Sequence, residues 1–599
     1  MEKQELQNRF DELAKILVKD MNPQGFWSGE LSSSALGVAV AIAAFHFYDA
    51  EQFKLEIAKG FDWLKNNINA DGSFGDSPQS PGNVSTSLLV YGATNLYSSS
   101  EADVALLQSK VGQYLLTEGI DTKSSQVADY ILEHYRKDYT FSVPILTMCG
   151  LCGVPDERAF DRVPQLPFEM ALLPRGFYRF FNLSVVSYAI PALIAVGIVI
   201  FKKKKSSAFG RFVRNRSVRK SLALLDRLAP ASGGFLEAIP LTAFVCLSLI
   251  EAGYGDLEVV KKGIGFLKQT QRGDGSWPID VDLSTWVTGL SVRALRNQKD
   301  KVLSQEVQDQ IANHLVRIQN KQVHPFNGSQ PGGWGWTNHA GAVPDGDDTP
   351  GTILTLLKLK PIGEVQAPAV AGCDWLVGLQ NRDGGFPTFS RGWSKLPFDQ
   401  SCADLTGHAL LAISATIEAV GDGVNGKQSK MFRTSIVGAI KYLEKNQQAN
   451  GSWIPLWFGN QLTSDHSNPV YGTARVLTYL RDASRHQWLN PNLKSRVSEL
   501  ISRGEQFLVH SRNEDGSWGG DKSVVGTMEE TALAVSALTG SEHQKACDDG
   551  LKWLDFSFKR NGLRPSPIGL YFASLWYDEK LYPLSFYLEA LSRAIEKLK

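Results

Sequence analysis

Long apolar runs with few polar interruptions recur along the 599-residue chain. Residues 33–48 and 405–420 are two of them, and neither shows the strict alternation of a half-buried strand. Their length and spacing predict helices, and helices that are apolar on every side are expected to form an inner layer covered by other helices. Further runs of this kind occupy residues 242–253, 285–295, 349–359, 471–480 and 530–540.

A short polar pattern recurs between these runs. Residues 266–278, 442–454 and 507–519 each begin with an aromatic residue, carry Gln or Arg five positions later, and end in Asp/Asn-Gly-Ser-Trp. Residues 375–387 and 63–75 follow the pattern with Phe in place of Trp, and residues 22–27 and 230–235 are weaker copies. A repeat of helix, glycine turn and helix predicts helical hairpins that bury their apolar faces by stacking on their neighbours.

Charge and cysteine content exclude several classes of protein. Lys plus Arg and Asp plus Glu are both 62, so the chain lacks the basic surplus of a nucleic-acid-binding protein. The six cysteines are too scattered for a disulfide framework, and the CxxC formed by Cys149 and Cys152 has no second pair, so we interpret both as buried apolar residues. Residues 1–21 form an amphipathic pattern without the features of a signal peptide, which favours the cytosol.

Three carboxylates lie within four positions at Asp345, Asp347 and Asp348, followed by Thr, Pro and an apolar run. Such a cluster can cap a helix N-terminus, hold a metal or act as an acid. No HxxxH, Cys/His cluster or DDxxD accompanies it, so we expect neither a metal nor a cofactor. Asp404 and His408 are spaced i, i+4 and therefore share one helix face.

These motifs together resemble the squalene–hopene cyclase and oxidosqualene cyclase family of class II terpene cyclases, over nearly the whole chain. The repeats resemble its QW repeats, Asp345–Pro350 resembles its Asp-x-Asp-Asp-Thr-Ala signature, and Asp404–His408 resembles its Asp-x-Thr-x-His motif. The resemblance implies an all-α fold of two α/α barrels with the active cavity between them, and a possible homodimer. We expect one barrel from residues 1–24 and 261–599, carrying the acid motif, and an inserted barrel from residues 25–260.

The resemblance also implies roles for the polar residues. Asp347 would be the general acid that protonates an alkene, and Asp345 and Asp348 would help to keep a proton on the cluster, because burial and neighbouring carboxylates raise a carboxyl pKa. Asp404 would keep His408 positively charged, and His408 would hydrogen-bond Asp347.

Aromatic residues are expected to complete the site, because aromatic faces stabilise carbocations without reacting with them. Matching by local motif gives Trp286, Trp336, Trp457, Phe398, Phe572 and Tyr577 as substrate-binding candidates. The chain departs from the family's hopene makers at residues 334–338, is shorter before Asp404 and is longer after Trp457. The substrate, the number of rings and the terminating step therefore stay open.

Residues 184–201 are apolar and precede four lysines at 202–205. The run just reaches the length of a membrane span, and Pro191 interrupts it. The resemblance implies that a segment of about residues 167–205 dips into one leaflet, with a true span or a buried core helix as alternatives. We therefore expect a monotopic protein on the cytoplasmic face of a membrane, whose lysines bind anionic headgroups.

The resulting hypothesis is an isomerase-type cyclase that converts a linear polyprene such as squalene into a hopene-type triterpene. The alternatives are a cyclase of another polyprene, including a prenyl diphosphate, and an inactive lipid-binding barrel. A prenyltransferase-like barrel would need an Asp/Cys/His zinc site, which the sequence does not show. A glycoside hydrolase on an α/α barrel would use two carboxylates.

Overall fold

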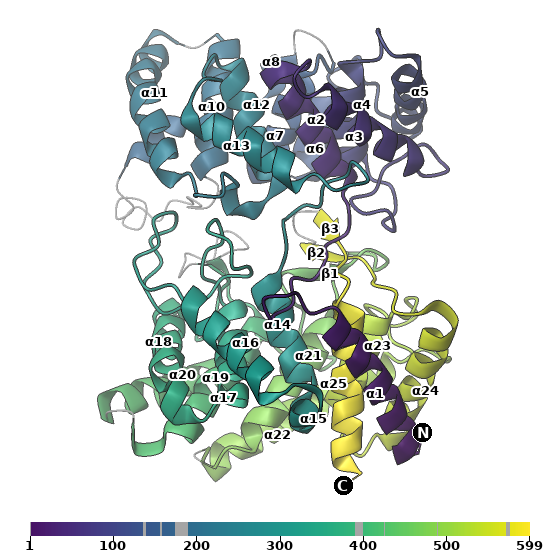
Figure 1. Ribbon diagram of the computed structural model, residues 1–599, viewed down its shortest axis with the longest axis vertical. Coiled ribbons are helices and arrows are strands. Elements are labelled where there is room, and N and C mark those ends of the chain that lie inside the picture. The colour runs from purple at the N-terminus through teal and green to yellow at the C-terminus, as the bar shows by residue number, and fades with distance from the viewer. Residues whose placement is uncertain are drawn as a thin grey trace. The chain divides into compact units, whose positions relative to one another are not determined.

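The computed structural model describes residues 2–135, 139–155, 159–173, 190–205, 207–389, 399–423, 426–487, 489–570 and 575–598. These residues are mostly helical and divide into two compact units (Figure 1). Unit 1 comprises residues 1–30, 282–338 and 343–599, and unit 2 comprises residues 31–281 and 339–342. The fold is all-α with two α/α barrels.

Unit 1 is a closed ring of inner helices covered by outer helices. Each inner helix packs against the next, and the last returns to the first. The inner helices, in order around the ring, are α14 (Ser284–Ala294), α17 (Asp348–Leu359), α19 (Ala403–Val420), α21 (Pro469–Ser484), α23 (Met528–Leu538) and α25 (Tyr582–Lys597). The outer helices are α1 (Lys3–Lys19), α16 (Gln305–Ile318), α18 (Ile362–Leu379), α20 (Gly426–Asn446), α22 (Pro491–His510) and α24 (Gln544–Asn561), with short segments η4 (Arg296–Gln298), α15 (Lys299–Val302) and η6 (Gly421–Gly423).

The two ends of the chain meet in unit 1. Helix α1, at the N-terminus, packs on α25, at the C-terminus, and Figure 1 shows them side by side. The guanidinium of Arg9 on α1 binds the carboxylate of Asp555 on α24 at 2.7 Å. The N-terminal helix therefore supplies an outer position of a ring built mainly from residues after 281.

Unit 2 has the same two-layer construction. Its inner helices pack in the order α2 (Ala35–Asp49), α4 (Val84–Asn95), α7 (Tyr139–Leu151), α10 (Ile190–Lys203) and α12 (Ile239–Glu251), and α12 returns to α2. The remaining elements are α3 (Lys54–Asn66), α5 (Ala102–Thr117), α6 (Gln126–His134), α8 (Ala159–Arg162), η1 (Phe168–Leu172), α11 (Ala208–Leu228), η3 (Phe235–Glu237) and α13 (Glu258–Thr270).

The boundary expected after residue 260 is wrong by one helix. Helix α13 packs against α12, α2 and α11, so it belongs to unit 2, and the chain enters unit 1 only at residue 282. Sequence alone misplaced it because α13 leads directly into the repeat at residues 266–278, which looks like the start of the second series of repeats. At the N-terminal side, unit 1 extends to residue 30 rather than 24.

The repeated tryptophan is buried and hydrogen-bonds the helix that precedes it. In three repeats the indole N–H donates to the carbonyl of the residue ten positions earlier, at the end of the preceding outer helix: Trp277 to Leu267, Trp453 to Leu443 and Trp518 to Leu508. The repeated glycine precedes it in a turn with φ near +90°, and a Cβ at Gly275 would lie 2.3 Å from a backbone oxygen. A residue with a side chain does not fit there.

Two more repeats are complete although their sequences are irregular. The indole of Trp27, in the weak copy at residues 22–27, donates to Leu17 at 2.7 Å. The indole of Trp334 donates to Leu315 at 2.7 Å, although the intervening turn is longer than in the other repeats. Because the connection is longer, the indole and its acceptor are 19 residues apart instead of ten, and the sequence pattern therefore did not reveal the Trp334 repeat.

The repeated glutamine links one hairpin to the next. The amide of Gln447 donates to Gly451 in its own turn and to Leu500 on the following outer helix, at 2.9 and 3.0 Å. Gln319 and Gln380 make the equivalent pairs of bonds. Each glutamine amide therefore joins the turn of its own repeat to the following outer helix.

Helix α10 contains the apolar run expected in the membrane. Between Pro191 and Phe201 its side chains are mostly buried against α7, α12 and η1. Packing inside unit 2 therefore accounts for the apolar character of this part of the run. Residues 174–189 of the expected membrane segment lie outside the described residues, and none of the described helices is long and apolar enough to cross a membrane.

A small antiparallel sheet, absent from the sequence prediction, lies in unit 1. Its strand order is β1 (Phe458–Asn460), β2 (Ile568–Leu570) and β3 (Leu575–Tyr577), with Gly459 opposite Gly569 and Gly569 opposite Trp576. The strands are too short for a periodicity to be recognised.

We expect Thr473→Val to destabilise unit 1. Its hydroxyl accepts a hydrogen bond from the backbone N–H of Trp453 at 2.9 Å, and valine would leave that buried N–H unpaired at a cost of about 1–3 kcal/mol. Urea denaturation of the full chain measures the change. The control is Thr434→Val, an exposed threonine on α20, which should change stability by less than about 0.5 kcal/mol. Equal midpoints for both variants would contradict the assignment.

Candidate active site

The two polar motifs occupy equivalent places in neighbouring repeats of unit 1. In each repeat the hydroxyl of a threonine at the start of an inner helix accepts a hydrogen bond from the backbone N–H of the repeat's Trp or Phe. The five pairs are Thr288 with Trp27, Thr349 with Trp334, Thr406 with Phe386, Thr473 with Trp453, and Thr531 with Trp518, at 2.9–3.1 Å. The threonines of both family motifs are therefore structural residues of the repeat.

The residue two positions before each threonine defines the site. These residues are Trp286, Asp347, Asp404, Tyr471 and Glu529, one from each of five inner helices or their N-caps. Because the threonine contact fixes the same backbone position in each repeat, the five side chains begin from equivalent points around one ring. Asp347 and Asp404 thus come together through repeat geometry, although 56 residues separate them in the sequence.

Asp345 caps the helix that carries the acid motif. Its Oδ1 accepts hydrogen bonds from the backbone N–H groups of Asp347 and Asp348, at 2.9 and 2.7 Å. Asp345 thus satisfies two backbone N–H groups at the start of α17, although the N-cap residue itself is Asp347. Gly346 makes room for this turn, since a Cβ there would lie 2.3 Å from the carbonyl oxygen of Pro387.

The three carboxyl groups differ in exposure. The side chain of Asp347 is 18% exposed, whereas Asp345 and Asp348 are 4% and 5% exposed. Burial raises the pKa of Asp345, and burial together with the Asp345 charge holds the pKa of Asp348 well above its ordinary value. Asp347 is therefore the member of the cluster best able to reach a bound molecule.

Asp347 is held by His408 on α19. The Nδ1 of His408 lies 2.6 Å from Oδ1 of Asp347, as the sequence predicted. Burial raises the pKa of Asp347 to about 6, against the opposing charges of Arg475 and Arg293. At mildly acidic pH this carboxyl is protonated, in contrast to an aspartate in water.

The expected positive charge on His408 is wrong. Its Nε2 lies 2.6 Å from Nη1 of Arg293, a group that always carries its protons. Nε2 must accept that hydrogen bond, so the imidazole is neutral with its proton on Nδ1, donated to Asp347. Burial, with the charges of Arg293 and Arg475, agrees by holding the pKa of His408 well below its ordinary value.

Asp404 does not contact His408 in the way the sequence predicted. Its Oδ1 lies 2.5 Å from Sγ of Cys402, which donates to it. Burial raises the pKa of Asp404 to about 6, and the charge of Asp347 acts in the same direction. Asp404 is thus a buried neighbour of the acid. The i, i+4 spacing places Asp404 and His408 on one face of α19, but it does not determine which group the carboxyl of Asp404 hydrogen-bonds.

Arginine 475 on α21 is an unusual buried cation. It is 3% exposed, and its Nη2 has no hydrogen-bond partner among the described residues. Its Cζ lies 5.3–5.8 Å from the centres of four aromatic rings, those of Trp286, Tyr471, Tyr479 and Phe586. Tyr479 also stacks on His408, with ring centres 4.5 Å apart. The arginine and the histidine therefore share one aromatic wall.

Two of the predicted aromatics form a chain with a residue that the sequence analysis missed. The ring of Phe389 lies 6.0 Å from Trp336 and 5.6 Å from Trp457, edge to face in both cases. All three rings are half-buried, so part of each face is accessible. The indole N–H of Trp336 is buried with no partner among the described residues.

Trp286 and Tyr577 are placed differently. Trp286 is buried, its indole N–H donates to Tyr582 at 3.1 Å, and its ring lies 6.1 Å from that of His408. Tyr577, on β3, is buried and interacts with the hydroxyl of Tyr582. The structure therefore places Trp286 beside the acid network, where little of its surface is open to a substrate. Phe398 and Phe572 lie outside the described residues.

Arg293 and Arg475 were missed although the sequence contains a signal. Each is a charged residue inside a run otherwise apolar on all sides, residues 285–295 and 471–480. Arginine is almost never buried without a partner, so an arginine in such a run indicates a specific buried interaction. Phe389 had no comparable signal, because a phenylalanine in an irregular segment is an ordinary core residue.

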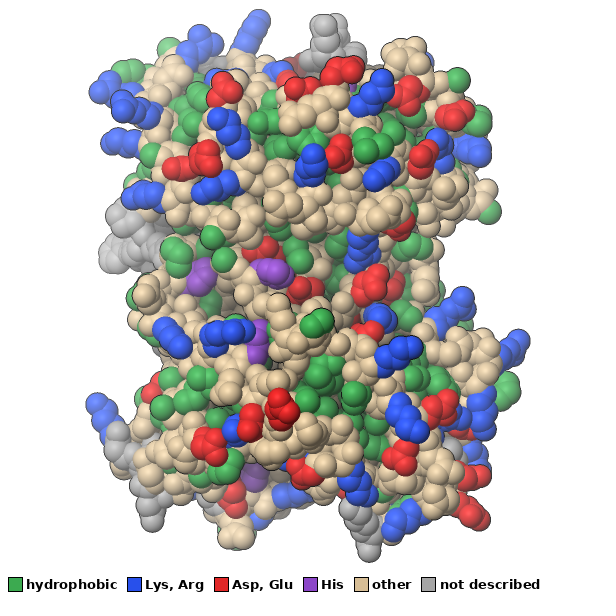
Figure 2. All heavy atoms as spheres, viewed as in Figure 1, with side chains coloured by type: hydrophobic (Ala, Val, Ile, Leu, Met, Phe, Trp, Pro, Cys, Tyr) green, Lys and Arg blue, Asp and Glu red, His purple; other side chains and the backbone are tan. Residues whose placement is uncertain are grey.

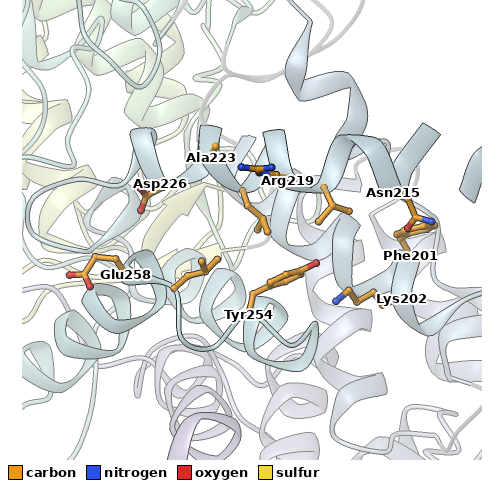
Figure 3. Close-up of a pocket in the computed structure, with 11 residues that line it drawn as sticks. Phe201, Lys202, Asn215, Arg219, Ala223, Asp226, Tyr254 and Glu258 are labelled. Carbon is orange, nitrogen blue, oxygen red and sulfur yellow. The ribbon is translucent and has the colours of Figure 1, made fainter. Parts of the chain in front are cut away.

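A cavity of about 660 Å³ lies within unit 2 (Figure 3). Lys202 and Tyr254 line it, with the lysine Nζ 4.1 Å from the tyrosine ring, and Arg219, Asp226 and Glu258 also contribute. Apolar residues, among them Phe201, Val218 and Leu222, form the rest of the lining. Within the described residues, no group of three His, Cys, Asp or Glu side chains is arranged to hold a metal ion.

Curated proteins similar to this chain include an enfumafungin synthase from Hormonema carpetanum, 24% identical over 86% of this chain and 42% of that protein. A squalene hopane cyclase from Aspergillus fumigatus is 23% identical, over 82% and 75% of the two chains. A squalene–hopene cyclase from Alicyclobacillus acidocaldarius is 21% identical, over 79% and 78%. The chain spans less than half of the first of these proteins.

Family profiles cover both units. The squalene-hopene cyclase N-terminal domain matches residues 11–123, and the squalene-hopene cyclase C-terminal domain matches residues 283–593. The second match alone covers more than half of the chain and contains the acid cluster, Asp404, His408, Arg293 and Arg475. The chain belongs to the squalene–hopene cyclase family.

Proposed function

We propose that this protein is a class II terpene cyclase that starts ring formation by protonating an alkene with Asp347. The observation that carries the proposal is the state of that carboxyl. It is the most exposed of the three, its pKa is raised to about 6, and a neutral histidine donates to one of its oxygens. The other oxygen, Oδ2, is then the atom that can carry the proton to be transferred.

The reaction follows from this arrangement. The O–H bond of Asp347 breaks as a C–H bond forms at the terminal alkene carbon, which leaves a carboxylate on the protein and a tertiary cation on the substrate. Successive alkenes attack the cation, each forming a C–C bond. A proton lost from the final cation, or water added to it, ends the sequence, and solvent returns a proton to Asp347. The reaction needs no external oxidant or cofactor.

The chain of aromatic rings supports the same proposal. Trp336, Phe389 and Trp457 offer half-buried faces, and an aromatic face stabilises a nearby cation by about 0.5–2 kcal/mol without acting as a nucleophile. A glycoside hydrolase would instead need a second carboxylate open to water. Asp404 is buried and accepts a hydrogen bond from Cys402, so it is not a carboxylate open to water.

Squalene is the substrate we propose, with a hopene-type triterpene as the product. Support comes from two of the relatives, which are named as a squalene hopane cyclase and a squalene–hopene cyclase. Another polyprene, or a prenyl diphosphate, is the second candidate, because residues 334–338 and the segment after Trp457 differ from hopene makers. The possible homodimer stays a prediction, which light scattering on the purified protein measures.

We expect Asp347→Asn to abolish cyclic product while leaving the protein folded, because an amide cannot donate a proton to an alkene at useful rates. Detergent-solubilised protein is incubated with squalene, and products are identified by gas chromatography–mass spectrometry. Asp121→Asn, at an exposed aspartate in unit 2, is the matched control and should retain wild-type activity. A cyclic product made equally well by Asp347→Asn would rule out this acid. Wild-type protein that cyclises neither squalene nor shorter polyprenes nor their diphosphates would rule out the function.

We also expect activity to fall as the pH rises. The acid works only when protonated, and with a pKa raised to about 6 Asp347 is protonated below that pH and ionised above it. The wild-type kcat should therefore be highest on the acidic side and decline about tenfold for each further pH unit well above the pKa. Initial rates measured between about pH 5 and pH 8 test this, with circular dichroism at each pH to show that the fold is intact. A kcat that rises across this range would contradict a protonated Asp347.

We further propose that the protein binds a membrane surface through α11. Phe209 and Phe212 on this helix are 78% and 58% exposed. The same helix carries many basic residues, and Lys and Arg side chains gather over it in Figure 2. The basic residues are Arg211, Arg214, Arg216, Arg219, Lys220 and Arg227. Exposed aromatics among basic residues favour the interface of an anionic bilayer, where each Lys or Arg contributes about 1 kcal/mol.

The double variant Phe209→Ser/Phe212→Ser should bind anionic vesicles less than the wild type does. Co-sedimentation with vesicles of phosphatidylcholine and phosphatidylserine measures the bound fraction, and added salt should weaken it. Leu116→Ser on α5, which removes a comparably exposed apolar side chain, is the control. Unchanged binding of the double variant would show that α11 is not the docking surface.

A further inference from the structure

The acid of this chain lies beside two arginines and a neutral histidine. Arg293 comes from α14 and Arg475 from α21, so the two cations reach the acid from inner helices on either side of α17 and α19. Among the described residues of unit 1, neither guanidinium forms an ion pair with a carboxylate. Arg475 is buried and Arg293 is half-buried. Taking an unpaired charge out of water is costly, so two such charges near one carboxyl call for an explanation.

Arg293 determines the state of His408. Because Nη1 of Arg293 donates to Nε2 at 2.6 Å, a doubly protonated imidazole would place two donors against each other. The result is a continuous chain from Arg293 through the neutral imidazole to Oδ1 of Asp347.

Arg475 acts through space. Its four surrounding rings exclude water and stabilise the guanidinium by their faces, so its field is screened less than that of a surface arginine. It stays charged at every accessible pH. A nearby carboxyl that loses its proton therefore gains more stabilisation from Arg475 than it would in water.

We propose that Arg293 and Arg475 are positioning residues that supply the positive charge beside Asp347, which His408 itself does not carry, and that this charge strengthens the acid by stabilising the carboxylate left after proton transfer. Arg293 acts through His408, and Arg475 acts by its field. The inference rests on the proposed function of Asp347 and adds two residues to it.

Other charged and titratable groups also face Asp347. They are Asp345 just before α17, Asp348 at its start, Asp404 and His408 on α19, and Tyr471 and Tyr479 on α21. The charge of Asp347 raises the pKa of Asp345 and Asp348, whereas burial opposes ionisation of Asp347 itself and the two arginines favour it. Glu589 on α25 accepts a hydrogen bond from Arg593 at 3.0 Å, and its charge also acts on Arg475.

The test exploits two opposite effects of removing a cation. In Arg293→Gln and Arg475→Gln the carboxylate is less stable, so Asp347 becomes a weaker acid but also keeps its proton to higher pH. We expect kcat at low pH to fall by about tenfold or more, and the alkaline limb of the pH–rate profile to move upward by about one pH unit. KM should change little, because both side chains bind protein groups.

Damage to the fold predicts the reverse shift. A loosened site admits water, which moves the pKa of Asp347 down towards its ordinary value and the alkaline limb towards lower pH. Arg293→Gln keeps a donor for His408 and removes only the charge, whereas Arg293→Lys keeps the charge and should leave the limb where the wild type has it. An alkaline limb that stays in place or moves downward in both glutamine variants would overturn the proposal.

Two measurements on the substrate-free protein separate this inference from the proposed function. Infrared difference spectra between wild type and Asp347→Asn follow the carboxylic acid of Asp347 during a pH titration, and its pKa should rise in both glutamine variants. Nitrogen-15 NMR, assigned with His408→Gln, should show a neutral imidazole protonated at Nδ1. An imidazolium, or a pKa of Asp347 that both variants leave unchanged, would overturn the inference even if the protein proves to cyclise polyprenes. The expected shifts would support it even if squalene proves the wrong substrate.

Discussion

The hydrogen bond between a threonine hydroxyl and the backbone N–H of the preceding repeat aromatic is the contact on which unit 1 depends. It joins the turn after each outer helix to the first turn of the next inner helix, and it recurs with nearly the same length in five repeats. Because it fixes the backbone at the mouth of each inner helix, the side chain two positions earlier has a fixed starting point. The repeats thus provide a rigid frame in which one position can vary from Trp to Asp, Tyr or Glu without disturbing the fold.

This frame resolves a conflict at the acid. A carboxyl that must be protonated near neutral pH needs burial and neighbouring carboxylates, but a carboxyl that must give up its proton to an alkene needs stabilisation of its anion. In unit 1 the two requirements fall to different groups. Burial keeps the proton on Asp347, while the charges of Arg293 and Arg475 favour its carboxylate from neighbouring helices. A free-standing carboxyl cluster on a surface loop could not combine both.

The sequence predicted the helical layers and the repeats because these depend on local patterns. A run such as residues 405–420 is apolar over several turns, and the Asp-Gly-Ser-Trp turn needs glycine wherever it occurs. The boundary at residue 281 was not predictable, since α13 is joined to its unit by packing that leaves no local mark. The predicted charge of His408 was wrong for the same reason. Spacing along α19 shows which residues share a face, but it does not show that an arginine on α14 donates a hydrogen bond to the second ring nitrogen.

The two arginines limit how strong the acid can become. Each cation that stabilises the carboxylate lowers the barrier to proton transfer but also lowers the pKa, so a smaller fraction of Asp347 is protonated at a given pH. General acids work best when their pKa lies near the working pH, because the product of these two factors is then greatest. A value raised to about 6 lies between an exposed aspartate and a fully buried one. A charged His408 in direct contact with Asp347 would push this balance towards ionisation. In the mechanism proposed here, the neutral imidazole of His408 separates Arg293 from Asp347, and Arg475 acts from within an aromatic wall. Both cations would then strengthen the acid while leaving its proton in place.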